Sequence, residues 1–228
     1  MVRYRVSRLA CGRRDHHFRV QKLVVPILTW RKVEKVVRYL AISIHCWLQK
    51  NPDIDRATCP IRLGHNDSVP PEQLLTLLAE PEDSKNILLL LNLVSGHPLL
   101  LYRIDRAWRT FNSPLVLYSN LKESSQRLEW HLWRIYRARN LLVHHGMEPR
   151  FIPQLANHLQ QYFSWTLSRI LHGLTFGPEW RATDSWTFWK SKSDHVLRSL
   201  KTNAKMLVVG DMFPEELPAS HFPVWADR

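Results

Sequence analysis

The sequence is poor in glycine and cysteine and has no long apolar run. Its seven glycines among 228 residues supply few of the tight turns that an all-β chain needs. Its three cysteines (Cys11, Cys46 and Cys59) are odd in number and lack metal-ligand spacing, which argues against a disulfide framework. The longest apolar run, Ile87 to Val94, is interrupted by Asn92 and is far too short to cross a bilayer. No apolar segment of signal-peptide type follows the basic N-terminus. We therefore expect no membrane segment and a cytoplasmic protein.

Positive charge and tryptophan are abundant. Lysine and arginine number 32 against 20 aspartates and glutamates, which gives a formal charge of +12. This excess favours an anionic partner, with nucleic acid first and an acidic membrane surface second, although a solvated basic face would give the same excess. There are ten tryptophans, and no glycine-rich phosphate loop, internal repeat or low-complexity tract is present.

Apolar residues recur at helical spacing along most of the chain. The expected helices cover 28–48, 71–78, 86–94, 99–111, 119–145, a segment from Pro149 or Pro153 to about Gly173, and 183–200. The segment 86–94 is apolar nearly all round, which predicts a helix buried on most sides, and periodicity alone leaves a buried strand open. The segment 119–145 is expected to be the longest helix. The fold class that follows is all-α, an antiparallel helical bundle of five or more helices.

Four consecutive regions are expected along the chain. Residues 1–25 form a basic N-terminal arm, either ordered or loose, and residues 26–80 form an N-terminal helical region. Residues 81–202 form the main helical bundle, and residues 203–228 form an irregular tail that contains three prolines.

One charged residue interrupts the apolar stripe of the segment 119–145. At about 100° per residue, Arg139 falls on the same side as Ile135 and Leu142. An unpaired guanidinium buried there would cost roughly several kcal/mol. We therefore expect Arg139 to be ion-paired inside, to reach the edge of the helix, or to face a cleft or a second subunit.

Polar residues suited to phosphodiester chemistry follow Arg139. Asn140 and His144 are i, i+4 neighbours, His145 points further round the helix, and Gly146 is placed to end it. Arginine offers forked donors to phosphate oxygens, histidine exchanges protons near neutral pH, and asparagine can orient either partner. A simpler alternative is that His144 only caps the last carbonyls of the helix.

The segment Arg139-Asn140-x3-His144-His145-Gly146, preceded by Trp133 to Arg137, resembles the motif of HEPN-domain proteins (higher eukaryotes and prokaryotes nucleotide-binding). That motif is an arginine, usually followed by a polar residue, and a histidine after four to six intervening residues. The resemblance covers roughly Ile87 to Leu200 and is greatest to the ApeA-type HEPN domains of bacterial defence proteins. It implies a HEPN-like bundle in region 81–202 that usually dimerises, with the motifs of two subunits in one composite cleft.

The resemblance also implies an activity. HEPN proteins of this type are metal-independent endoribonucleases that cleave RNA by attack of the ribose 2′-hydroxyl, with no cofactor. By this resemblance, Arg139 would stabilise the charge on the phosphate, and a histidine would carry out the proton transfers. His144 fits the shortest spacing of the family and His145 the next, and the relation to Asn140 favours His144. The implied setting is anti-phage defence or a toxin-like system, with RNA and a second copy as partners. The sequence identifies no regulatory partner or antitoxin.

Other residues leave alternatives open. Arg103, Arg106, Arg134 and Arg137 are tentative RNA-binding residues, and a solvated basic face explains them equally well. The histidines lack partners at ligand spacing, so no metal site is predicted. Trp186 and Trp189 could stack bases, but their helical spacing favours the core. The alternative functions are a catalytically silent HEPN-like module that binds RNA or a protein partner, and a purely structural bundle.

Overall fold

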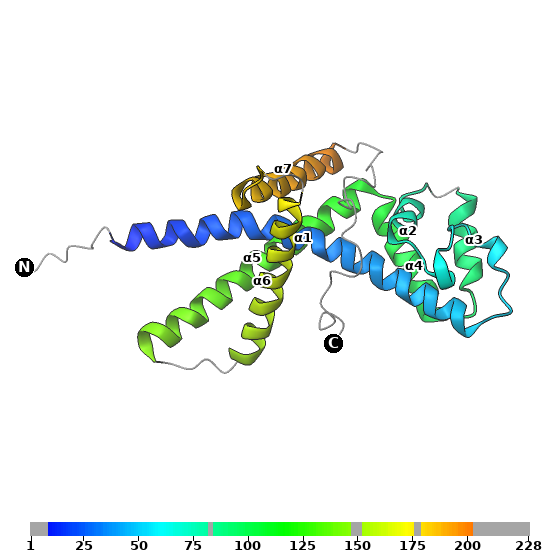
Figure 1. The fold of residues 1–228 in the computed structure, drawn as a ribbon, viewed down its shortest axis with the longest axis horizontal. Helices are drawn as coiled ribbons and strands as arrows, with labels where there is room; N and C mark the ends of the chain where they lie inside the picture. The colour runs from blue at the N-terminus through cyan, green and yellow to red at the C-terminus, as the bar shows by residue number, and fades with distance from the viewer. Residues whose placement is uncertain (1–8, 82–83, 147–151, 176–178, 203–228) are drawn as a thin grey trace, which may run out of the picture. The chain divides into compact units, whose positions relative to one another are not determined.

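The chain is helical in almost every part that the structure describes. The computed structural model describes residues 9–81, 84–146, 152–175 and 179–202. Within these ranges there are seven α-helices, two short 3-10 turns and no strand, so the all-α prediction is confirmed (Figure 1). The helices are α1 Leu9–Lys50, α2 Pro71–Leu78, α3 Lys85–Leu93, α4 Pro98–Phe111, α5 Pro114–His145, α6 Ile152–Leu174 and α7 Ala182–Lys201.

The first helix is longer than its sequence pattern indicated. Helix α1 begins at Leu9 rather than near residue 28, and its 42 residues exceed the 32 of α5, so the expectation that the segment 119–145 is the longest helix is wrong. Residues 9–25 carry basic side chains without apolar periodicity, which hid their helical state. Pro26 lies inside α1 without ending it. The described part of the basic arm is therefore ordered.

The chain forms two compact units, each built from two separate segments. Unit 1 consists of Met1–Thr29 and Lys122–Ser193, and unit 2 of Trp30–Leu121 and Asp194–Arg228. Helices α1, α5 and α7 each contribute residues to both units. The four consecutive regions expected from the sequence remain a prediction, and the tail 203–228 lies outside the described residues.

Unit 2 contains a close-packed apolar core. Its largest fully buried side chains include Ile44 and Leu48 of α1, Leu74, Leu75 and Leu78 of α2, Ile87 and Leu90 of α3, and Ile104 of α4. Helix α3 begins after Ser84, whose hydroxyl accepts a hydrogen bond from the Asn86 amide at 3.2 Å. The expectation that this segment is buried on most sides is wrong. Leu88 and Leu89 are 56% and 44% exposed, because α3 packs with only one face against α2 and α4.

Unit 1 holds the second part of α5 together with α6 and the first parts of α1 and α7. Gly173 of α6 lies so close to Ser185 of α7 that a Cβ atom at residue 173 would be 2.0 Å from the serine hydroxyl. Trp189 is buried, and its indole nitrogen donates to the Arg169 carbonyl at 3.2 Å. Trp189 therefore belongs to the core, as its spacing favours, and is not a platform for bases.

Candidate functional site

Helix α5 ends where the sequence predicts. Its last residue is His145, and Gly146 follows with φ of +61°, a left-handed conformation that glycine adopts readily. The Gly146 amide donates to the Leu142 carbonyl at 3.2 Å, which satisfies one of the last carbonyls of the helix. The predicted motif is thus carried on the final two turns of a regular helix.

Arg139 is exposed rather than buried. Its Nη1 donates to Oδ1 of the neighbouring Asn140 at 3.1 Å. The apolar stripe around it is exposed as well, because Leu142 and Val143 are 46% and 56% accessible to solvent. The charge of Arg139 therefore carries no burial penalty in the single chain. The apolar side chains beside Arg139 are exposed to solvent in the single chain.

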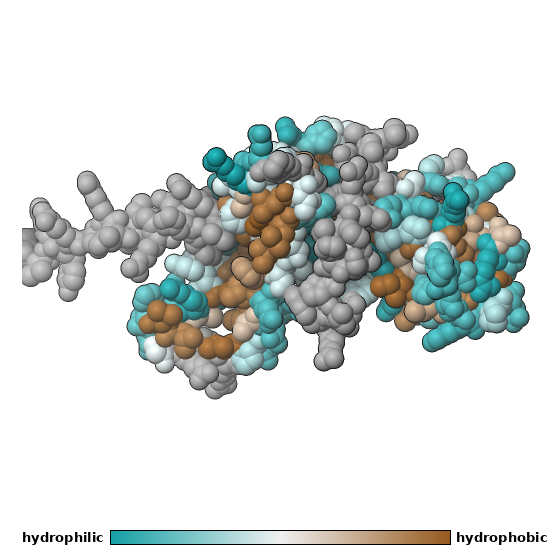
Figure 2. Space-filling view, in the orientation of Figure 1, coloured by the Kyte–Doolittle hydropathy of each residue, from teal (hydrophilic) through white to brown (hydrophobic). Residues whose placement is uncertain are grey.

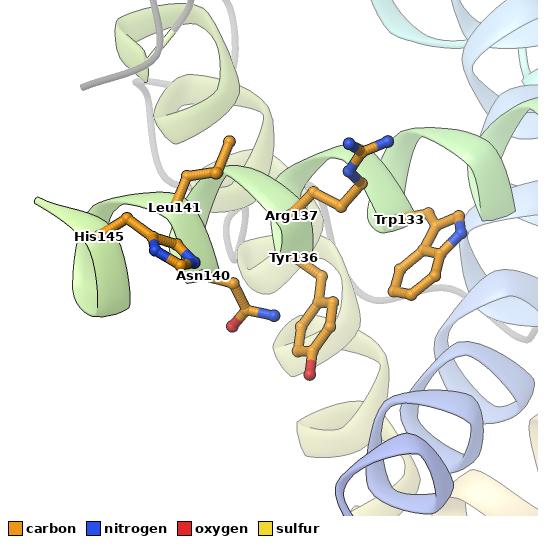
Figure 3. A pocket seen from close by; sticks show the side chains of 6 residues that line it. All are labelled: Trp133, Tyr136, Arg137, Asn140, Leu141 and His145. Carbon is orange, nitrogen blue, oxygen red and sulfur yellow. The ribbon is translucent and has the colours of Figure 1, made fainter. Parts of the chain in front are cut away.

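A shallow groove of about 360 Å³ lies along this part of α5 (Figure 3). Among the described residues it is lined by Trp133, Tyr136, Arg137, Asn140, Leu141 and His145. The rings of Trp133 and Tyr136 are stacked, with centroids 5.4 Å apart and planes 17° from parallel. The volume is at the lower end of the roughly 300–1,000 Å³ found for small-molecule sites.

The groove brings together some of the predicted residues. Asn140 and His145 line it, and Arg139 is joined to it through its hydrogen bond to Asn140. His144 is exposed and is not part of the lining. The structure thus places His145 beside Asn140, whereas helical spacing favours His144. Which histidine acts remains a prediction.

The four tentative RNA-binding arginines lie in different parts of the fold. Arg137 lines the groove and Arg134 is exposed one turn earlier on α5, while Arg103 and Arg106 are exposed on α4 in unit 2. None of the four forms an ion pair with another described residue. Each guanidinium is therefore available to an anionic ligand.

A second polar cluster, between α5 and α6, has no counterpart in the sequence pattern. His131 Nδ1 lies 2.8 Å from the Tyr162 hydroxyl, and the rings of His131 and His158 meet edge to face with centroids 4.7 Å apart (83°). Burial lowers the pKa of His131, and the nearby charges of His158 and Arg134 lower it further. Burial also raises the pKa of Tyr162. At neutral pH this cluster therefore pairs a neutral imidazole with a protonated phenol.

The sequence pattern predicts neither the stacked pair Trp133–Tyr136 nor the cluster around His131. Trp133 and Tyr136 stand at i, i+3 spacing, which is a usable signal for a stacked pair on a helix surface. His131 and His158 are 27 positions apart on separate helices, so no local spacing indicates their contact. Only the packing of α6 on α5 brings them together.

The described residues contain no group of three or more histidine, cysteine, aspartate or glutamate side chains that could hold a metal ion. None of the described helices has the length and apolar character needed to cross a membrane. Comparisons of the chain with models of protein families, with curated proteins and with solved structures found no match.

Proposed function

We propose that this protein is a metal-independent endoribonuclease of the HEPN type. The observation that carries the proposal is the end of α5, where Asn140 and His145 line a surface groove and Arg139 is hydrogen-bonded to Asn140. Phosphate-binding, orienting and proton-transferring groups are thereby gathered within two helical turns. The resemblance of Arg139-Asn140-x3-His144-His145 to the HEPN motif supports the same reading.

The proposed reaction uses only phosphate-binding and proton-transferring side chains. A histidine, His144 or His145, accepts the proton of the ribose 2′-hydroxyl as that oxygen attacks the phosphorus. The bond from phosphorus to the 5′-oxygen breaks, and the leaving oxygen takes a proton from an imidazolium. Arg139 stabilises the charge that builds on the phosphate oxygens. The products are a 2′,3′-cyclic phosphate and a 5′-hydroxyl.

A second copy of the chain is proposed as the partner that completes the site. Helix α6 carries an exposed apolar band, visible in Figure 2, made of Leu159, Phe163, Leu167, Leu171 and Leu174. These residues repeat every three or four positions and so share one helix face. Leu142 and Val143 extend the exposed apolar surface on α5, next to Arg139. Burial of these side chains by the second copy would bring two motifs to one cleft.

The biological setting rests on the resemblance alone. We propose a cytoplasmic role in anti-phage defence or in a toxin-like system, where RNA cleavage stops growth. A protein of this type requires control by a trigger or an antitoxin.

A second candidate is a catalytically silent module that binds RNA. The exposed arginines favour it, because guanidinium groups bind phosphate without any proton transfer. It differs from the first candidate only in the role of the histidines.

Cleavage in the presence of EDTA separates the two candidates. Purified protein is incubated with single-stranded and structured RNA, and the 3′ ends are analysed for cyclic phosphate. We expect cleavage by the wild type, at least 100-fold slower cleavage by Arg139→Ala, and the same loss from one of His144→Ala and His145→Ala. His195→Ala, which changes an exposed histidine on α7, is the control and should cleave normally. Equal cleavage by all variants, or RNA binding without cleavage by the wild type, would rule the enzyme out.

A further inference from the structure

We infer that the RNA backbone runs along α5 from the motif to the cluster between α5 and α6, where Arg134 and His158 together bind one of its phosphates. This inference rests on the proposed function for RNA as the ligand. It adds which part of the RNA is bound and in which direction the strand leaves the scissile phosphate. It also gives His158 a role that the sequence pattern does not indicate.

One row of polar side chains on α5 joins the motif to the cluster. Its members are spaced by three residues, so that neighbours lie about 5–6 Å apart on the helix surface. They are His131, Arg134, Arg137 and Asn140, and we call them the α5 row. Arg134 and Arg137 are exposed, and neither forms an ion pair with a described residue. Both guanidinium groups are therefore available to phosphate oxygens.

The α5 row is long enough to bind more than one phosphate. At a rise of 1.5 Å per residue, its two ends are about 14 Å apart along the helix axis. A single strand covers that length with roughly four nucleotides at a rise of about 3.4 Å each. A strand whose scissile phosphate lies at the motif can therefore place a neighbouring phosphate at the far end of the row.

At its far end the α5 row meets a side chain of α6. The Tyr162 hydroxyl lies 2.8 Å from His131 Nδ1 and holds the His131 ring, and His158 meets that ring edge to face with centroids 4.7 Å apart. Arg134 is the i+3 neighbour of His131 on α5. The charges of His158 and Arg134 both lower the pKa of His131, which is consistent with their lying close to it. Two helices thus bring Arg134 and His158 to one imidazole.

No carboxylate on these two helices balances the positive groups of the site. Helix α6 contains no aspartate or glutamate, and α5 contains none after Glu129. Like charges on Arg134 and a protonated His158 repel, and a bound anion offsets this repulsion. The guanidinium can donate two hydrogen bonds to a phosphate and the imidazole one. A metal cation would be repelled by Arg134, so the site favours an anion.

The contacts of His158 leave its nitrogens available. Within the described residues they are ring contacts, with His131 and with Tyr162, whose ring centroid is 6.2 Å away. His158 is exposed, so a ligand in solvent can reach it. His131 and Tyr162 are only partly exposed and serve to position the site.

The test measures binding of a strand that this chemistry cannot cleave. A 2′-O-methyl oligonucleotide lacks the attacking hydroxyl, and fluorescence anisotropy gives its Kd for the full-length protein over a range of NaCl concentrations. Loss of one phosphate contact lowers the slope of log Kd against log [NaCl] by about 0.7 for a single strand. Arg134→Gln and Arg137→Gln should each produce this decrease. Uridine and adenosine strands should be affected equally, because phosphates carry no sequence information.

The pairing of Arg134 with His158 has its own readout. His158→Ala should weaken binding about 5-fold, the equivalent of one net hydrogen bond of about 1 kcal/mol. Because Arg134 and His158 contact the same phosphate, combining His158→Ala with Arg134→Gln should cost less binding free energy than the sum of the two single changes. Circular dichroism should show unchanged helix content, since both side chains are exposed.

Arg198→Gln and His195→Ala are the matched controls. Both residues are exposed on α7, so these changes remove the same chemical groups outside the α5 row. Each should leave the salt slope unchanged and alter Kd by less than about twofold, because salt screens charges that do not contact the strand.

Four results would overturn the inference. They are no binding of the strand by the wild type, an unchanged salt slope in Arg134→Gln or Arg137→Gln, additive losses from Arg134→Gln and His158→Ala, and equal losses in the controls. The two proposals fail separately. If RNA is cleaved but the variants of the row bind normally, the enzyme stands and the backbone path does not. If the backbone path is confirmed but RNA is not cleaved, the silent module is the better description.

Discussion

His131 is the described residue whose titration most clearly reports on the packing of α6 against α5. The groups that face it are Arg134 on its own helix and His158 and Tyr162 on α6. Burial contributes most to its lowered pKa. An unfolded histidine titrates near 6.5, so as the pH falls below about 6.5 the unfolded chain binds protons before His131 does. The free energy of unfolding should therefore decrease below that pH, and this group has no effect above it.

We predict that His131→Gln makes unfolding less sensitive to acid. Glutamine can still hydrogen-bond to the Tyr162 hydroxyl but does not titrate. Urea unfolding at pH 7.5 and pH 5.5 should show a smaller loss of stability in the variant than in the wild type. The variant should still lose some stability at pH 5.5, because burial and the charge of Arg169 also lower the pKa of His172. The same pH dependence in both proteins would show that His131 takes no part in it.

The candidate site could be predicted from the sequence only as far as it is local. Gly146 ends α5 as its position indicates, and Arg139 was identified as anomalous because it breaks an apolar stripe. Its exposure could not be predicted, since the sequence does not say which part of a stripe another helix covers. That His145 lines the groove with Asn140, while His144 does not, could not be predicted either, because spacing along one helix does not say where a groove forms.

At the scale of helices, the sequence pattern predicts that a helix exists better than it predicts where the helix begins and ends. Helix α2 begins at Pro71, and that proline predicts its start. Helix α4 begins at Pro98, one residue before the start that the apolar pattern predicts. The first half of α1 lacks an apolar period, so the sequence pattern does not predict the helix there. The sequence predicts more burial of α3 than the structure has, because an apolar segment is buried only where a neighbouring helix packs on it.

The contact between α6 and α7 gives a prediction at this scale. Gly173→Ala should destabilise the protein by about 1–3 kcal/mol, the usual cost of overpacking, because the new Cβ would meet Ser185 Oγ at 2.0 Å and its Cβ at 2.5 Å. Helix propensity alone favours alanine over glycine, so the same substitution at an exposed helix position without a close neighbour would be expected to stabilise the protein. Urea unfolding measures the change.

Combining the change with Ser185→Gly provides the control. The serine side chain is then absent, and the double variant should be more stable than expected from the sum of the two single changes. Simple additivity of the two changes would mean that this contact does not limit the packing of the helices.

At the scale of the whole molecule, the exposed apolar band on α6 should control assembly. We predict that the wild type is a dimer by light scattering and that Phe163→Asp shifts it to a monomer, because a carboxylate would be buried without a partner. Phe163 is 65% exposed in the single chain, so the substitution should leave the fold intact by circular dichroism. Leu88→Asp, on the exposed face of α3, is the control for added charge. A monomeric wild type at high concentration would remove the composite cleft.

The interleaved order of the two units limits how the protein can be divided. Each unit draws on an early and a late segment, and the boundaries fall inside α1, α5 and α7 rather than in loops. No single truncation can therefore release a complete unit, and a fragment that stops at any of the three boundaries would end in the interior of a helix. Gene fusions and deletion series on this chain should accordingly preserve it whole. Exchange of one unit between related proteins would require three matched junctions.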